Sequence, residues 1–236
     1  MTEWRARRTY QAVAVVECRG GYGIALDGKP ITTPEGRPLV LPSRPLAQAL
    51  AAEWQAQGQH VDPLAMPLTR LAGSAIDLVG PHRAAVVERT AAYAETDLLC
   101  YRALGPEALA EHQEAEWQPL VDWVAQHLEA PLRVTAGIVA IEQPALSLAT
   151  LRRAVEASDD WHLTALAAAT AACGSLILGL ALAEGEIAAE AAWALSELDE
   201  SYQIELWGED PEARRRREVQ RADIAAAARF LALLAS

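Results

Sequence analysis

Two pairs of carboxylates are the side chains of this sequence that could do acid–base chemistry. Glu114 with Glu116, and Asp159 with Asp160, could act as general acid and base if they faced a cleft. Solvated helix faces carry such pairs constantly, so a surface role is the favoured interpretation. A small-molecule enzyme that uses acidic residues in an interdomain cleft is the alternative hypothesis. A deep pocket that holds carboxyls of raised pKa would favour it.

A phosphate-binding loop is suggested by the stretch from Gly23 to Lys29, which fits the first seven positions of that motif. The next position is Pro30, whereas the motif needs a Ser or Thr there to reach magnesium. The context also differs, because a P-loop opens a helix and this stretch predicts a hairpin around Asp27-Gly28. We therefore expect a tight turn and no bound nucleotide.

Metal and nucleophile motifs are weak in this sequence. Asp159-x-x-His162 is a single poor copy of the Glu-x-x-His pattern of helical metal sites, and HExxH and Cys-x-x-Cys are absent. The sequence has no Gly-x-Ser-x-Gly elbow. Cys173 lies in an apolar segment, where a thiol behaves as a small hydrophobe. We expect no metal, no cofactor and no catalytic residue.

The segment Ser196–Glu212 has the most unusual charge pattern of the chain. It contains seven acidic residues and no basic one, and Arg214–Arg217 follows directly. Trp207-Gly208 predicts the end of a long amphipathic helix. Trp207 could cap the core or present an aromatic hot spot rimmed by charge. An acidic face of this kind suits a surface that holds another protein, and we expect the arginines to pair with nearby acids at the start of a solvated helix.

Composition limits the partners and the compartment. The formal net charge of −12 argues against nucleic acid, which needs clustered Lys and Arg on a basic face. Cys18, Cys100 and Cys173 are odd in number and far apart, which indicates a reducing compartment without a disulfide framework. The first residues have no signal-peptide core, and the early strand leaves no room for a transit peptide, so we expect a bacterial cytoplasmic location.

The uncharged stretch Leu163–Ala183 is long enough to span a membrane. Its richness in Ala, Thr and Gly and its acidic flanks, which lack basic anchors, favour instead a helix buried on all sides. We expect a protein that is not embedded in a membrane. A membrane-associated protein is the third hypothesis, which purification without detergent would eliminate.

Hydrophobic patterns predict an α+β fold, with a small N-terminal antiparallel β-sheet domain that carries one helix, then an all-helical C-terminal domain. The domains are expected at residues 1–65 and 66–236. Ser43 is the expected N-cap of the first helix, which should end at Gln57 and place Leu46, Leu50 and Trp54 against the sheet. Residues 133–142 fit either an extended segment or a short helix. The predicted strands are 10–17, 22–26, 31–33 and 38–41, and the later helices are 81–99, 106–128, 147–157, 160–183, 187–206 and 211–234.

A set of short segments, in this order and spacing along nearly the whole chain, resembles one family: the assembly chaperones of the F-type ATP synthase that act on its α subunit. The segments are Leu26-Asp27-Gly28-Lys29-Pro30, Thr33-Pro34, Leu41-Pro42-Ser43, Glu53-Trp54-Gln55-Ala56-Gln57, Met66-Pro67-Leu68-Thr69, Thr96-Asp97-Leu98-Leu99-Cys100-Tyr101, Gln113 with Trp117, and Tyr202-Gln203 with Trp207-Gly208. Family members usually carry a basic residue before the acids of the last motif, where this chain has Glu197.

The resemblance implies a chaperone rather than an enzyme. Such a protein binds the free α subunit and shields its β-contacting surface until the hexamer forms. The family is known in mitochondria, and we expect a bacterial member that is a monomer. The expected client-binding residues are Glu200, Gln203, Glu205, Trp207 and Gly208, with Trp54, Gln57 and Asp97 as a second group. Trp54 and Asp97 could instead fix the junction between the domains, and the acids could serve solubility alone.

Overall fold

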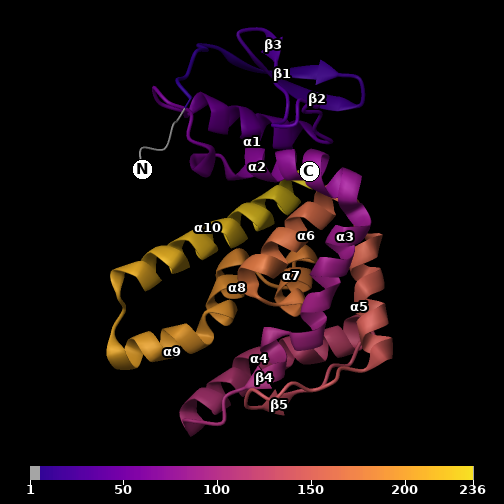
Figure 1. The fold of residues 1–236 in the computed structure, drawn as a ribbon, viewed down its shortest axis with the longest axis vertical. Helices are drawn as coiled ribbons and strands as arrows, with labels where there is room; N and C mark the ends of the chain where they lie inside the picture. The colour runs from indigo at the N-terminus through magenta and orange to yellow at the C-terminus, as the bar shows by residue number, and fades with distance from the viewer. Residues whose placement is uncertain (1–5, 236) are drawn as a thin grey trace. The chain divides into compact units, whose positions relative to one another are not determined.

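The structure is a computed structural model that describes residues 6–235 (Figure 1). It begins with an antiparallel sheet of three strands in the order β1-β2-β3. These strands are β1 (Val13–Cys18), β2 (Gly21–Leu26) and β3 (Lys29–Pro30). Asp27 and Gly28 have φ of 47° and 79°, the positive values of a type I′ turn, so the predicted hairpin is confirmed.

The return strand of this hairpin differs from the prediction. A two-residue turn pairs Leu26 with Lys29, so the strand returns at β3 rather than at residues 31–33. The predicted strand at 38–41 is reduced to isolated bridges, which pair Thr32 with Pro38 and Tyr22 with Leu41.

Helix α1 (Arg44–Gln55) covers the sheet. The Ser43 hydroxyl accepts a hydrogen bond from the Leu46 N–H at 3.2 Å, as expected for an N-cap, and donates to the Leu233 carbonyl at 2.6 Å. Leu46 and Leu50 are fully buried. The helix ends two residues before the predicted Gln57, whose side chain shapes the following turn by donating to the Glu53 carbonyl and accepting from the Asp62 N–H.

The rest of the chain is mainly helical, which confirms the α+β class. The helices are α2 (Pro67–Ser74), α3 (Gly80–Ala91), α4 (Glu107–His127), α5 (Ala145–Ala157), α6 (Asp160–Cys173), α7 (Leu176–Ala183), α8 (Ala189–Ser196), α9 (Leu198–Trp207) and α10 (Pro211–Leu234). Short 3-10 turns cover Pro63–Ala65, Ala92–Thr96 and Leu98–Cys100, and a π-helical segment covers Ala75–Val79.

Three predicted helices are broken or shortened. The stretch 160–183 is two helices, because Gly174 takes a left-handed φ of 65° and Ser175 starts α7 as its N-cap. The stretch 187–206 is also two helices, broken at Glu197, where φ and ψ are −109° and 15°. The helix predicted over 81–99 ends at Ala91 and continues as 3-10 turns.

The ambiguous segment 133–142 is extended. Its strand β5 (Thr135–Ala136) pairs in parallel with β4 (Tyr101–Arg102), so the C-terminal part is not purely helical. Each strand is only two residues long, too short for a period-2 pattern to predict it.

Two compact units divide the described chain. One contains the chain up to Arg83 together with Asp160–Thr164 and the segment from Arg229; the other contains Ala84–Asp159 and Ala165–Ala228. The boundary predicted after residue 65 stays a prediction. In the second unit, α7 is buried from Leu176 to Leu182, which agrees with the burial expected for this part of the uncharged stretch. Within residues 6–235, no helix combines the length and apolarity needed to cross a membrane.

Candidate functional site

The end of α9 presents two large apolar side chains to solvent. Leu206 is 55% exposed and Trp207 is 77% exposed. Gly208 ends the helix with a φ of 83°, and its N–H bonds to the Ile204 carbonyl at 2.8 Å. Of the two interpretations of Trp207, core capping is therefore wrong, and an exposed aromatic is what the fold displays.

The residues expected on α9 divide between two faces of the helix. Glu200, Gln203 and Trp207 are spaced i, i+3 and i+7, which places them on one face. Glu205 belongs to the opposite face, where it lines a groove together with Tyr202. The client-binding residues predicted on α9 therefore lie on two opposite faces of the helix and do not form one acidic surface.

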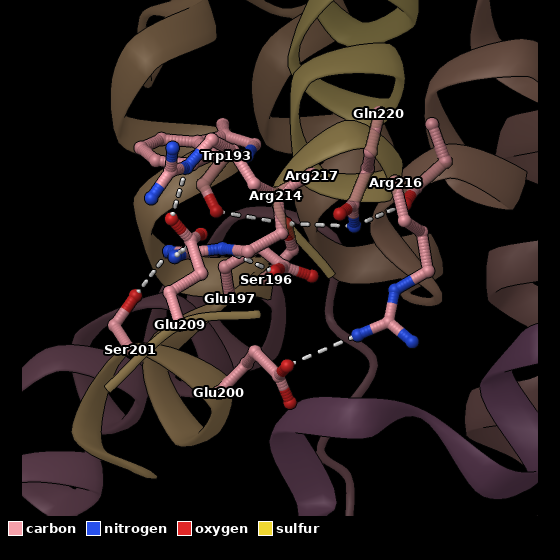
Figure 2. A network of polar contacts seen from close by, with 11 residues as sticks. Trp193, Ser196, Glu197, Glu200, Ser201, Glu209, Arg214, Arg216, Arg217 and Gln220 are labelled. Carbon is pink, nitrogen blue, oxygen red and sulfur yellow. Dashed lines mark hydrogen bonds and ion pairs between the residues drawn. The ribbon is translucent and has the colours of Figure 1, made fainter. Parts of the chain in front are cut away.

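Arg217 is the centre of a polar network that ties α8, α9 and α10 together (Figure 2). Its guanidinium donates to Glu197 at 2.9 Å, to Glu209 at 3.1 Å and to the Ser201 hydroxyl at 2.7 Å. It also lies over the Trp193 ring, 5.2 Å from the centroid. Arg217 and Glu197 are largely buried, so this pair fixes the helices firmly.

The neighbouring arginines neutralise further acids, as the sequence predicted. Arg214 pairs with Glu209 at 2.9 Å, and its hydrogen bond, together with Arg217, lowers the pKa of Glu209. Arg216 pairs with Glu200 at 3.1 Å (Figure 2). The acidic face suggested by Ser196–Glu212 is therefore compensated across the turn between α9 and α10, and the charges are separated in sequence but not in space.

A groove of about 610 Å³ runs between α4, α8 and α9. Leu120, Leu195 and Leu198 are its buried floor. Glu116 on α4 and Glu205 on α9 are exposed on its walls, and neither forms an ion pair with any residue between 6 and 235. Unlike the acids that face α10, these two carboxylates keep their charge available to a partner.

Comparison with known proteins identifies the family. The model of the ATP12 chaperone protein family matches residues 7–125, half of the chain. The chain belongs to the ATP12 chaperone family.

Solved structures with the same fold are similar to this chain over nearly its whole length. The chain is 45% identical to Atp12 from Paracoccus denitrificans, with a TM-score of 0.93 over 98% of this chain and 100% of that one. It is 43% identical to a protein of Agrobacterium tumefaciens, with a TM-score of 0.92 over 97% and 86% of the two chains. It is also 27% identical to the mitochondrial protein atp12 of Schizosaccharomyces pombe, over 86% of this chain and 74% of that protein.

Asp97, predicted as a client-binding residue of this ATP12 family chain, is fully buried. Its carboxylate accepts hydrogen bonds from the Ser175 hydroxyl and the Leu176 N–H, both at 2.7 Å, and from the N–H groups of Ile177 and Leu99 at 3.1 Å. Burial raises the pKa of Asp97 to about 6, against the lowering effect of these hydrogen bonds. The side chain holds the N-terminus of α7 to the turn that precedes β4.

Trp54 and Gln57 lie in the first unit, where the segments that carry the family resemblance are joined to one another by hydrogen bonds. The Glu53 carboxylate accepts from the N–H groups of Leu68 and Thr69, both at 2.8 Å, and so caps α2. The Trp54 carbonyl accepts a hydrogen bond from the Tyr10 hydroxyl at 2.7 Å. The Gln57 side chain is buried, with 7% of the residue exposed. These residues serve the local fold of their unit.

A cavity of about 910 Å³ in the first unit is lined in part by residues of the segments that carry the family resemblance. The lining includes Thr33, Pro34, Trp54, Met66 and Thr69. Its carboxylate Asp77 already accepts from the Thr33 hydroxyl at 2.8 Å and lies 3.7 Å from Arg37.

The acid pairs that could have done chemistry are not gathered at one site. Glu114 lies 3.6 Å from Arg102, and Asp160 lies 2.7 Å from Arg83. Residues 6–235 contain no group of three or more His, Cys, Asp or Glu that could hold a metal. Burial raises the pKa of Asp97, but its oxygens are occupied by hydrogen bonds within the fold.

Sequence reasoning missed the α4 wall of the groove. His112, Ala115, Glu116 and Pro119 are exposed and spaced i, i+3, i+4 and i+7, so they share one face of α4. Pro119, inside a predicted helix, was the signal that could have pointed to this wall, because a proline has no N–H to donate to the carbonyl four residues before it.

Proposed function

We propose that the chain is an assembly chaperone of the F-type ATP synthase, and that it binds the free α subunit and shields its β-contacting surface until the hexamer forms. Membership of a chaperone family supports the general role. The observation that carries the proposal for this chain is the exposed pair Leu206-Trp207, presented at the end of a helix that the Arg217 network fixes. Together with Gly208, this pair ends α9.

The physical reason is the behaviour of an unassembled subunit. A subunit that awaits its partner exposes apolar surface that would otherwise aggregate. A tryptophan at the end of a fixed helix binds such surface with little entropic cost, because its side chain has few rotatable bonds to order. Charged groups around it, here Glu205 and the ion pair of Glu200 with Arg216, speed the encounter and permit release. Gln203, on the same face as Trp207, adds an adaptable hydrogen-bonding group.

Trp54, Gln57 and Asp97 enter the proposal in a supporting role. Gln57 and Asp97 are buried and bonded within their own units, so a client would reach them only through a change of structure. We propose that their substitution lowers stability first and client binding as a consequence.

The test is capture of purified α subunit by the tagged chain and by its Trp207→Ala variant. Truncating a central aromatic anchor costs at least about 2 kcal/mol, so we expect affinity to fall about 30-fold or more. Val219→Ala is the matched control, because Val219 is 62% exposed on α10 and outside the proposed surface. Both variants should keep the wild-type melting temperature. Failure of the wild-type chain to capture the α subunit would overturn the proposed function.

A further inference from the structure

The groove between α4, α8 and α9 has a shape that can accept a further helix. Its α4 wall is the stripe His112, Ala115, Glu116 and Pro119. Its α9 wall is a second stripe, Leu198, Ser201, Tyr202 and Glu205, with the same i, i+3, i+4 and i+7 spacing. Two such stripes that flank an apolar floor are the surface into which the ridge of another helix packs.

The floor of the groove is apolar along its length. Leu120 and Leu195 are buried beneath it, together with Leu198 at the foot of the α9 wall. Ala191 on α8 and Ile187, just before α8, also line it. Small residues, Ala115 and Ala194, are exposed at its sides and leave room for the side chains of a partner. A partner would therefore contribute an apolar stripe that packs against this floor.

The charge of the walls defines the flanks of that partner. Glu190 on α8, Glu197 at the junction of α8 and α9, and Glu200 on α9 are in ion pairs with arginines of α10. Asp199 on α9 accepts a hydrogen bond from the Gln113 side chain at 2.6 Å. Glu205 is outside these pairs, and so is Glu116 on the facing wall; no described residue neutralises either. Lys or Arg on both sides of an apolar stripe complements this arrangement.

The α4 wall carries one more acceptor. Pro119 has no N–H, so the bond that residue 119 of a regular helix would donate to the Ala115 carbonyl is missing. Ala115 and Pro119 both line the groove. A basic side chain that pairs with Glu116 can also donate to this carbonyl, which belongs to the preceding residue.

We propose that this groove binds an amphipathic helix of the α subunit, whose apolar stripe fills the floor and whose Lys or Arg residues pair with Glu116 and Glu205. This inference rests on the proposed function and adds the kind of segment that the chain recognises. The groove face of α9 and the Trp207 face would then grip the client from two sides of the same helix.

The first experiment reverses the charge of the walls. We expect the double variant Glu116→Lys, Glu205→Lys to bind purified α subunit at least about tenfold more weakly at low salt, with a smaller loss at high salt. The matched control is Glu212→Lys, Glu218→Lys, which makes the same charge change at exposed positions of α10 outside the groove. Retained binding by the groove variant, with normal capture by the wild-type chain, would overturn this inference and leave the proposed function standing.

The second experiment identifies the occupant. A photo-cross-linking amino acid at Ala194, which lines the groove, should react with one segment of purified α subunit. We expect mass spectrometry to place the cross-link in a helix with apolar residues at i, i+3 or i+4 and basic residues beside them. The same probe at Ala222, exposed on α10, should give no such product. Cross-links to an extended segment, or none from Ala194, would refute a helical occupant, and loss of all α-subunit capture by the wild-type chain would refute the function itself.

Discussion

Replacing Arg217 by Met should be the most damaging single change in the basic run Arg214–Arg217. The side chains of Arg217 and Glu197 are only 12% and 11% exposed, and Arg217 also bonds to Glu209 and Ser201. Removal of the cation leaves the Glu197 carboxylate buried without compensation, which costs about 3–5 kcal/mol. For a chain of this size, that is a fall in melting temperature of roughly 6–20 °C.

The same run supplies the control. Arg216 pairs with Glu200 at a similar distance, but the two side chains are 66% and 32% exposed. Solvent screens such a pair, so Arg216→Met should change the free energy of unfolding by about 0–1 kcal/mol. The contrast between two adjacent arginines isolates burial from charge, because both variants lose one positive charge.

The assay is urea denaturation of both variants and of the double variant Glu197→Leu, Arg217→Met. Replacing both members of a buried pair by apolar residues of similar volume is close to neutral, so the double variant should recover most of the lost stability. The reasoning would be refuted if Arg217→Met and Arg216→Met were equally stable, or if the double variant were no better than Arg217→Met alone.

Two further predictions concern the second unit. Burial raises the pKa of Asp97 from its ordinary 3.8 to about 6 in the folded protein. The stability that the protonated side chain contributes is therefore complete below pH 3.8 and is lost as the pH rises through about 6. Between these two values the free energy of unfolding should fall by about 1.4 kcal/mol per pH unit. Asp97→Asn should remove this slope from a plot of unfolding free energy against pH, and parallel plots would contradict the assignment. Gly179→Ala should lower the free energy of unfolding by about 1–3 kcal/mol, because a Cβ at Gly179 would collide with the Thr170 side chain and lie 3.2 Å from the Thr170 Cα. Thermal melts measure this loss, and an unchanged melting temperature would show that α6 and α7 can move apart.

Local signals predicted the elements whose geometry depends on adjacent residues. The Asp27-Gly28 turn and the Ser43 N-cap were predicted because each feature is decided within four residues of chain. The break at Glu197 was missed, because no Gly or Pro marks it and Glu is a good helix former. There the tertiary pairing of Glu197 with Arg217, twenty residues away, accompanies the break.

The roles of individual residues were less predictable than the family. An ordered set of segments indicated the family from sequence, and the family model confirms it. The family segments around Trp54 and Asp97, however, hold their own units together through hydrogen bonds such as that from the Leu176 N–H to Asp97, across 79 positions. A motif reports that residues recur together, and it does not report whether they face a partner or the core.

The sequence by itself determined the fold class, the hairpin and cap positions, the buried apolar helix and the likeness to a chaperone family. Tertiary structure alone decided which of its acids pair with arginines of α10 and which face a groove. Seven acids between Ser196 and Glu212 look alike in sequence. The turn at Gly208 brings α10 back so that its arginines reach Glu197, Glu200 and Glu209, and it leaves Glu205 on the groove. Charge pairing acts over a few ångströms of space, and distance along the chain does not measure it.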